Sequence, residues 1–169
     1  MQIQTERLLL RPLEERDFDA YLPLHSDPEV MRFVGGRHDP DAVRIRFDKL
    51  KGQWAEHRLG HWATYERESG RLVGAVGLLR HDDWTATDCR VEVGWLIGKR
   101  DWDRGYATEA GRASIDYAFV DLGLERLICI VDPRNVASRR VAEKLGLRLA
   151  GETIWRDYDV VWYETRQHS

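Results

Sequence analysis

The stretch that decides the fold is VEVGWLIGKRDWDRGYATEAG, residues 91–111. Its first residues alternate in character, with Val91, Val93 and Ile97 on one side, which predicts a strand. From Ala107 onward, small and apolar residues recur every three or four positions, which predicts an amphipathic helix that ends at Gly123. The apolar run RLICIV, residues 126–131, predicts the next strand. Because a strand–helix–strand crossover joins parallel strands, residues 90–131 predict a parallel pair.

The rest of the chain adds strands and helices on both sides of this unit. Toward the N-terminus we expect one strand over 3–12, helices over 13–27 and 40–60, and a strand pair, 61–66 and 71–81, around the polar turn RESGR. Toward the C-terminus, NVASRRVAEKLG predicts a helix that Asn135 caps and Gly146 ends, followed by an antiparallel pair within 147–166. The 169 residues therefore predict one α/β domain, 1–169, with a mixed central sheet and about four flanking helices.

Composition excludes several kinds of partner. The net charge of −3 gives no overall attraction to nucleic acid, and no apolar run is long enough to span a membrane. No secretory signal is visible, so a cytoplasmic location is the default expectation, in which Cys89 and Cys129 are reduced packing residues. His57 and His61 have helical metal-ligand spacing, but Gly60 lies between them and no third ligand is evident, so we expect no metal.

The turn before the helix at 107 has the character of an anion site. Helix N-termini present unpaired N–H groups and a partial positive charge, and Gly105 lets the backbone approach a ligand closely. The side chains of Arg104 and Thr108 could add donors to a phosphate. Neither a Walker A loop nor a Rossmann glycine motif is present. From the spacing alone, an ordinary turn is an equal alternative.

A second helix mouth, DPRNVASRRVAEKLG, follows the next strand. Asn135 stands at this mouth, and Arg139 and Arg140 make the segment locally basic. If the two strands are neighbours, both helices begin at the same edge of the sheet, where ligands of such sheets bind. A plain N-cap for Asn135 and a solvated face for the arginines are the alternative interpretations.

These segments together resemble the GNAT superfamily of acetyl-CoA-dependent N-acyltransferases, and within it the RimJ/RimL-like branch. The resemblance rests on TERLLLRPLEERDFDAY, VEVGWLIGKRDWDRGYATEA and NVASRRVAEKLGL, and it covers nearly the whole chain. It implies a GNAT-type domain in which the parallel strands splay apart. It also implies that acetyl-CoA is the cosubstrate and that an amine, on a peptide N-terminus or a small molecule, is the acceptor.

The resemblance further assigns cofactor contacts. It implies that backbone amides around Arg104, Gly105, Tyr106, Ala107 and Thr108 hold the pyrophosphate, and that the pantetheine arm pairs with Trp95, Leu96 and Ile97. Asn135 would hydrogen-bond the same arm, and Arg139 is a further candidate contact. Trp102 departs from the superfamily pattern, which often has Gln or Arg there.

Two residues are candidates for the chemistry. Glu92 points to the face opposite Val91 and Val93, and beside a cleft its carboxylate could take the proton of the ammonium, directly or through water. Ser138 is the candidate donor to the leaving thiolate, because Ala142 stands where many superfamily members have Tyr. The alternatives are an ion-paired sheet residue for Glu92 and a simple helix-start residue for Ser138.

The acceptor side is expected from the first two helices and the last hairpin. Its candidate side chains are Trp54, Tyr65, Trp84 and Trp155, each of which could equally serve packing alone. The leading hypothesis is acetylation of a peptide N-terminus. The alternatives are acetylation of a small amine, such as an amino acid, polyamine or antibiotic, and a CoA-binding module without catalysis. A homodimer is left open.

Overall fold

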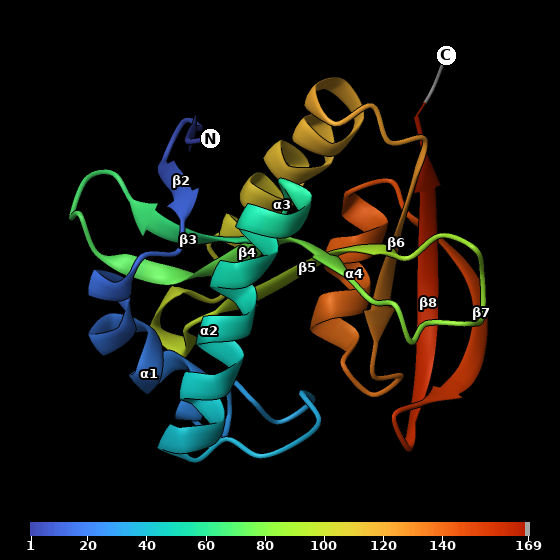
Figure 1. Ribbon diagram of the computed structural model, residues 1–169, viewed down its shortest axis with the longest axis horizontal. Helices are drawn as coiled ribbons and strands as arrows, with labels where there is room; N and C mark the ends of the chain where they lie inside the picture. The colour runs from blue at the N-terminus through green and yellow to red at the C-terminus, as the bar shows by residue number, and fades with distance from the viewer. Residues whose placement is uncertain (168–169) are drawn as a thin grey trace.

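The described part of the chain, residues 1–167 of a computed structural model, forms one eight-stranded sheet. The strands run in the order β1-β2-β3-β4-β5-β6-β8-β7 (Figure 1). Only β5 and β6 pair in parallel among these described strands, which confirms the predicted mixed sheet. The strands are β1 (Ile3–Gln4), β2 (Leu8–Pro12), β3 (His61–Glu66), β4 (Leu72–Arg80), β5 (Val91–Ile97), β6 (Arg126–Val131), β7 (Arg148–Trp155) and β8 (Tyr158–Arg166).

Four α-helices cover the sheet: α1 (Phe18–Ser26), α2 (Pro40–His57), α3 (Tyr106–Asp116) and α4 (Val136–Lys144). Successive side chains of β4 point to opposite faces of the sheet, and this divides the core into two clusters. Val76 packs in the cluster with Ala110 of α3, whereas Ala75 packs in the cluster with Phe47 of α2. The α1–α2 pair and α3 thus lie on opposite faces. None of the helices in this part of the chain combines the length and the apolar character that crossing a bilayer requires.

Three sequence expectations are corrected. The expected first strand, 3–12, is instead a hairpin of β1 and β2, because the Thr5 hydroxyl accepts from the Leu8 amide and turns the chain back. The helix expected to reach Leu122 is α-helical only to Asp116 and continues as one π-helical segment, Tyr117–Asp121. The helix expected over 13–27 is α-helical only over Phe18–Ser26 and is preceded by a 3-10 turn, Glu15–Asp17.

The parallel pair opens into a split. The ladder between β4 and β5 runs from Arg80–Val91 to Gly74–Ile97, but β5 and β6 are paired only at Glu92 and Ile128. From Glu92 onward β5 diverges from β6, which confirms the splayed pair. Both α3 and α4 begin beyond this split, so their N-termini lie at the same edge of the sheet.

The loop between β4 and β5 covers the other half of the sheet. It crosses in front of β6 and the β7–β8 hairpin (Figure 1). Trp84 of this loop is fully buried and packs with Ile128 of β6 and Val160 of β8. The loop therefore forms a wall beside the split, on the face that Glu92 occupies.

Candidate active site

The N-terminus of α3 is open. Gly105 is its N-cap with φ of +79°, a left-handed conformation that favours glycine, and no side chain caps this helix. Within residues 1–167, the backbone N–H groups of 104–108 donate to no protein acceptor. Such unpaired amides at a helix N-terminus form an anion site. Gly105 thus allows the left-handed backbone of the turn, in which the amides of residues 104–108 stay available to a ligand.

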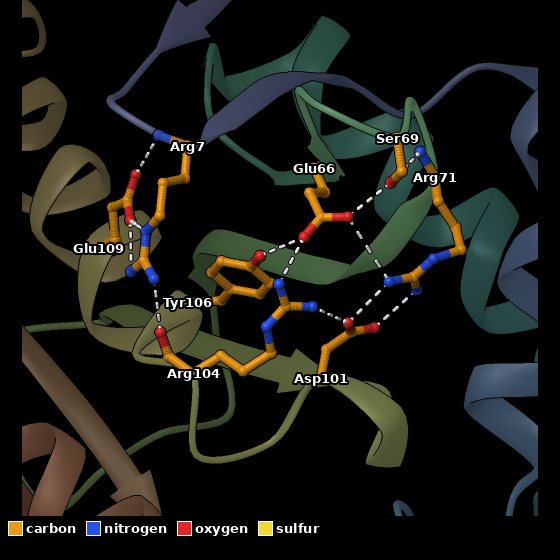
Figure 2. Close-up of polar contacts among 8 residues, drawn as sticks. All are labelled: Arg7, Glu66, Ser69, Arg71, Asp101, Arg104, Tyr106 and Glu109. Carbon is orange, nitrogen blue, oxygen red and sulfur yellow. Dashed lines mark hydrogen bonds and ion pairs between the residues drawn. The ribbon is translucent and has the colours of Figure 1, made fainter.

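Behind this turn, ion pairs hold the loop in place (Figure 2). The Arg104 guanidinium donates to Glu66 at 2.8 Å and to Asp101 at 3.1 Å, and Arg71 holds both oxygens of Asp101 at 2.7 and 2.8 Å. The Tyr106 hydroxyl also donates to Glu66. The Arg104 side chain is therefore engaged within the protein, and its backbone amide is the part free to meet a phosphate.

The Glu66 carboxylate is the centre of these contacts. Hydrogen bonds from Ser69 and Tyr106, and the positive charges of Arg104 and Arg71, lower the pKa of Glu66 to about 2. On the other side of the helix start, Glu109 accepts from Arg7. Arg104, Arg71 and Arg7 are thus matched by carboxylates, and the attraction for an anion at the helix start comes from the backbone.

Trp102 has a definite place in this loop. Its indole N–H donates to the carbonyl of Ile97 at 2.8 Å, while 42% of the residue is exposed. The side chain joins the loop to the end of β5. Sequence reasoning did not explain this residue, because the bond closes a turn whose path only the fold defines.

The N-terminus of α4 has a side-chain cap, whereas that of α3 has none. The Asn135 side-chain oxygen accepts from the Ser138 amide at 3.1 Å, so the predicted N-cap is present. The Asn135 side-chain amide group has no hydrogen-bond partner within residues 1–167 and can donate to a ligand. The Arg139 guanidinium donates to the Tyr163 hydroxyl at 3.0 Å and to the Pro133 carbonyl at 3.2 Å. Of the two helix mouths, the one at α3 is the better anion site.

Trp95 spans the split. Its indole N–H donates to the Ser138 hydroxyl oxygen at 3.3 Å. Because an indole N–H can only donate, the Ser138 hydroxyl is the acceptor and its own proton is free to point elsewhere. The structure thus brings together two predicted site residues, one from β5 and one from α4.

Glu92 lies where β5 leaves β6. One carboxylate oxygen accepts from the Ile130 amide at 3.0 Å, and the other lies 2.6 Å from His81 Nε2. The Glu92 carboxylate therefore accepts the hydrogen bond that the Ile130 amide no longer makes to the backbone of β5. His81 was missed by sequence reasoning, since nothing in its local pattern marks it and it comes just after β4. His61 of β3, considered above only as a metal ligand, lies beside Glu92 as well, across Gly94.

The structure separates the four aromatic side chains expected to line the acceptor-substrate site into two kinds. Trp84 is buried, Trp54 donates to the His61 carbonyl at 3.0 Å, and the Tyr65 hydroxyl bonds to Asp17. These three serve packing and internal hydrogen bonds. Trp155 differs, because its ring packs edge-to-face on His81 with centroids 4.8 Å apart.

An open groove of about 630 Å³ lies next to His81. The C-terminal half of α2, the residues after β4 and the turn between β7 and β8 enclose it. Its lining is polar and of mixed charge: Asp48, Lys49, Gly52, Gln53, Glu56, His57, Arg80, His81, Asp82, Asp83 and Arg156. Such a groove suits a polar, water-soluble molecule.

A split parallel pair, an open helix N-terminus beyond it and a carboxylate inside it define the class of acyl-CoA-dependent transferases. The family model described as "Acetyltransferase (GNAT) domain" matches residues 7–148, and the chain belongs to this family. It is an acyltransferase, and its family uses acetyl-CoA.

Known relatives agree with this assignment. An acetyltransferase structure from Agrobacterium tumefaciens is 32% identical, with a TM-score of 0.88 over 99% of this chain and 95% of that one. The FsC-acetyl coenzyme A-N(2)-transacetylase of Aspergillus fumigatus is 31% identical over 93% of this chain and 68% of its own. A ribosomal-protein-serine acetyltransferase structure from Vibrio cholerae, 21% identical with a TM-score of 0.80 over 99% and 98% of the chains, shares the fold.

Proposed function

We propose that this enzyme transfers the acetyl group of acetyl-CoA to a primary amine, most favourably the α-amine of a peptide N-terminus, by direct attack in a ternary complex. The observation that carries the proposal is the split between β5 and β6. The open amides of α3 lie beyond it, and the carboxylate of Glu92 lies within it on the face of the groove. Cosubstrate and acceptor would thus meet from opposite faces of the sheet.

The unpaired amides of residues 104–108 fit the pyrophosphate of acetyl-CoA. Gly105 favours this assignment, since its left-handed backbone leaves the loop amides without side-chain caps. The pantetheine arm would pair with backbone groups of Trp95, Leu96 and Ile97 along the open edge of β5. The Asn135 side-chain amide and Arg139 are the proposed contacts from α4.

Two side chains would handle protons. Glu92 would act on the acceptor ammonium, and its position in the split supports that role. Ser138 would donate to the leaving thiolate, supported by the bond from Trp95 that leaves its proton free. A backbone N–H of β5 would polarise the thioester carbonyl.

The acceptor follows from how much help an amine needs. An α-amine of pKa about 8 is roughly 10% neutral at pH 7, and a lysine-like amine of pKa about 10.4 is about 0.04% neutral, a difference of about 3 kcal/mol. Both Glu92 oxygens already hold a hydrogen bond or ion pair. This favours an α-amine as acceptor, because a larger fraction of it is already neutral and needs no base. The same preference agrees with the RimJ/RimL-like branch that the sequence resemblance implies.

A small-molecule amine is the second candidate. The mixed-charge lining of the groove suits it, and the FsC relative is named a transacetylase without reference to protein. A non-catalytic CoA-binding module is set aside by family membership. We also propose that residues 1–169 form one domain and that the enzyme works in the cytoplasm without nucleic acid, membrane or metal; the homodimer stays an open alternative to a monomer.

A panel experiment tests the proposal. Acetyl-CoA binding is first measured by calorimetry, and thiol release is then followed with N-terminal peptides, amino acids, polyamines and aminoglycosides. Peptides with a free α-amine should give the highest kcat/KM, and their acetylated forms should give none. Turnover confined to small amines would replace the proposed acceptor, and absence of acetyl-CoA binding would overturn the proposal as a whole.

A further inference from the structure

His81 is held in one orientation at the border of the groove. Its Nε2 lies 2.6 Å from Glu92, and its ring packs edge-to-face against Trp155. Its backbone amide donates to Arg90, and its carbonyl accepts from Trp84. The imidazole is thereby fixed between β4, β5 and β7.

The two ring nitrogens of His81 have different surroundings. Nε2 faces the Glu92 carboxylate, so at neutral pH the hydrogen on Nε2 is the one that this acceptor stabilises. Nδ1 has no partner among the described residues, and it is not sealed from solvent as the buried unpartnered atoms are. Because His81 lines the groove and Glu92 does not, we take Nδ1 as the ring nitrogen that is available to a molecule bound there.

A third group completes the arrangement. His61 Nε2 is buried and unpartnered within residues 1–167. A Cβ atom placed on Gly94 would lie 3.4 Å from His61 Nε2 and 3.9 Å from Glu92 Cδ. The missing side chain at Gly94 thus leaves a small space between a carboxylate and an imidazole. Burial lowers the pKa of His61 to about 4, so this imidazole is neutral at pH 7 and can accept a hydrogen bond.

We propose that His81 is the group that removes the proton from the acceptor ammonium, with Glu92 as its positioning residue and the neutral His61 on the other side of that carboxylate. This inference rests on the proposed function and refines it: the ammonium proton goes to His81, and Glu92 acts through His81 and not on the ammonium itself.

Proton transfer begins at the acceptor ammonium. An N–H bond of the ammonium breaks and the proton joins His81 Nδ1, directly or through one groove water. The freed amine lone pair forms the C–N bond at the thioester carbonyl and the C–S bond breaks; the second amine proton passes to the leaving thiolate through the Ser138 hydroxyl, which gives the amide and the free thiol. Glu92 accepts from Nε2–H and stabilises the imidazolium, as a carboxylate does behind a histidine base. His81 then returns the proton from Nδ1 to water in the groove.

Several charged or titratable groups face His81 or line the groove beside it. From β5 and β3 these are Glu92 and His61, and from the end of β4 and the β7–β8 turn they are Arg80, Asp82, Asp83 and Arg156. From α2 they are Asp48, Lys49, Glu56 and His57. Asp83 and Arg156 pair with each other at 2.7 Å, as do Arg80 and Asp82 at 2.8 Å, so Glu92 is the charge in direct contact.

The test compares the wild type with H81Q, H81A and H38Q, using the tripeptide Ser-Gly-Gly and spermidine as acceptors. We expect H81Q to lower kcat/KM about a hundredfold, with acetyl-CoA Kd within twofold of wild type. The wild-type pH–rate profile should contain a histidine ionisation that H81Q lacks. Added imidazole should restore part of the activity of H81A, which a packing role would not allow. H38Q, a histidine outside the groove, should match the wild type.

Two results would overturn the inference. One is an H81Q enzyme that keeps the wild-type kcat/KM and pH profile, which would leave Glu92 as the base. The other is a loss of activity in H81A that imidazole does not relieve, with acetyl-CoA binding intact. Failure of the proposed function looks different, because the wild type itself would then not bind acetyl-CoA or would acetylate neither acceptor.

Discussion

The indole N–H of Trp95 donates to the Ser138 hydroxyl across the split between β5 and β6, at 3.3 Å. This bond joins the strand that diverges to the helix on the far side. It also fixes which way the serine can donate. The two residues therefore act together in the proposed reaction.

Trp95 and Ser138 should depend on each other in kinetics. We expect S138A to lower kcat about 10- to 100-fold and W95F to lower it about 3- to 10-fold, the value of one hydrogen bond. Because Trp95 acts through Ser138, the double variant should be no slower than S138A. Thiol release at saturating acetyl-CoA measures this. Additive losses in the double variant would show that the two residues act separately.

Gly105 should be specific for cofactor binding. G105A places a Cβ in a left-handed conformation, at a cost of about 1 kcal/mol, and brings that atom to 3.4 Å from the Arg7 guanidinium beside the loop. We expect acetyl-CoA Kd to rise about tenfold by calorimetry. Gly123 is the matched control, since its φ is +65° and no atom lies within 4 Å of the added Cβ. G123A should lose similar stability and keep its affinity, and equal loss of affinity in both would refute the assignment.

Acid should weaken the loop through Glu66. Its pKa is about 2 in the folded protein and near 4.5 when unfolded, so its stabilising effect is complete above pH 4.5 and is lost as the pH falls toward 2. E66Q should lower the urea midpoint at pH 7 and make its decline below pH 4.5 shallower. E15Q, at an exposed carboxylate, should have a smaller effect at pH 7. A midpoint unchanged in E66Q would argue against this network as a support of the loop.

Two buried histidines should make the fold sensitive to milder acid. Burial lowers the pKa of His61 to about 4 and that of His25 to about 3. The unfolded chain binds these protons below pH 6.5 and the folded chain does not, so stability falls between pH 6.5 and 4. Each histidine contributes about 1.4 kcal/mol per pH unit. Urea unfolding from pH 7 to 4.5 should show a shallower slope in H61Q, but the wild-type slope in H57Q, whose side chain is 36% exposed.

The sequence predicted the parts of the fold that depend on local pattern. The 3.6-residue period of α3, the cap at Asn135 and the crossover from β5 to β6 are readable because each follows from neighbouring residues. The hairpin at Thr5 and the π-helical turn after Asp116 are not, since both depend on contacts made after folding. Within the site, the sequence predicted that the backbone amides of residues 104–108 form an anion site. The structure adds that these amides have no acceptor within residues 1–167.

The side-chain pairs of the site could not be predicted. His81, just after β4, and Glu92 of β5 are 11 residues apart, and Trp95 and Ser138 are 43 apart. Such contacts require the register of the sheet and the position of α4. Sequence reasoning assigned roles to Glu92 and Ser138 individually and missed the partner of each.

The bond from the Ile130 amide to Glu92 has a consequence for how variants of this enzyme are read. Beyond the last paired position, this carboxylate substitutes for the backbone oxygen that a continuing neighbour strand would have supplied. Its removal would leave that amide unsatisfied and alter how far the two strands stand apart. The hydrogen-exchange rate of the Ile130 amide reports on that spacing independently of turnover. A Glu92 variant with slow exchange and low activity has lost chemistry, whereas one with fast exchange has lost the shape of the cleft in which the chemistry occurs.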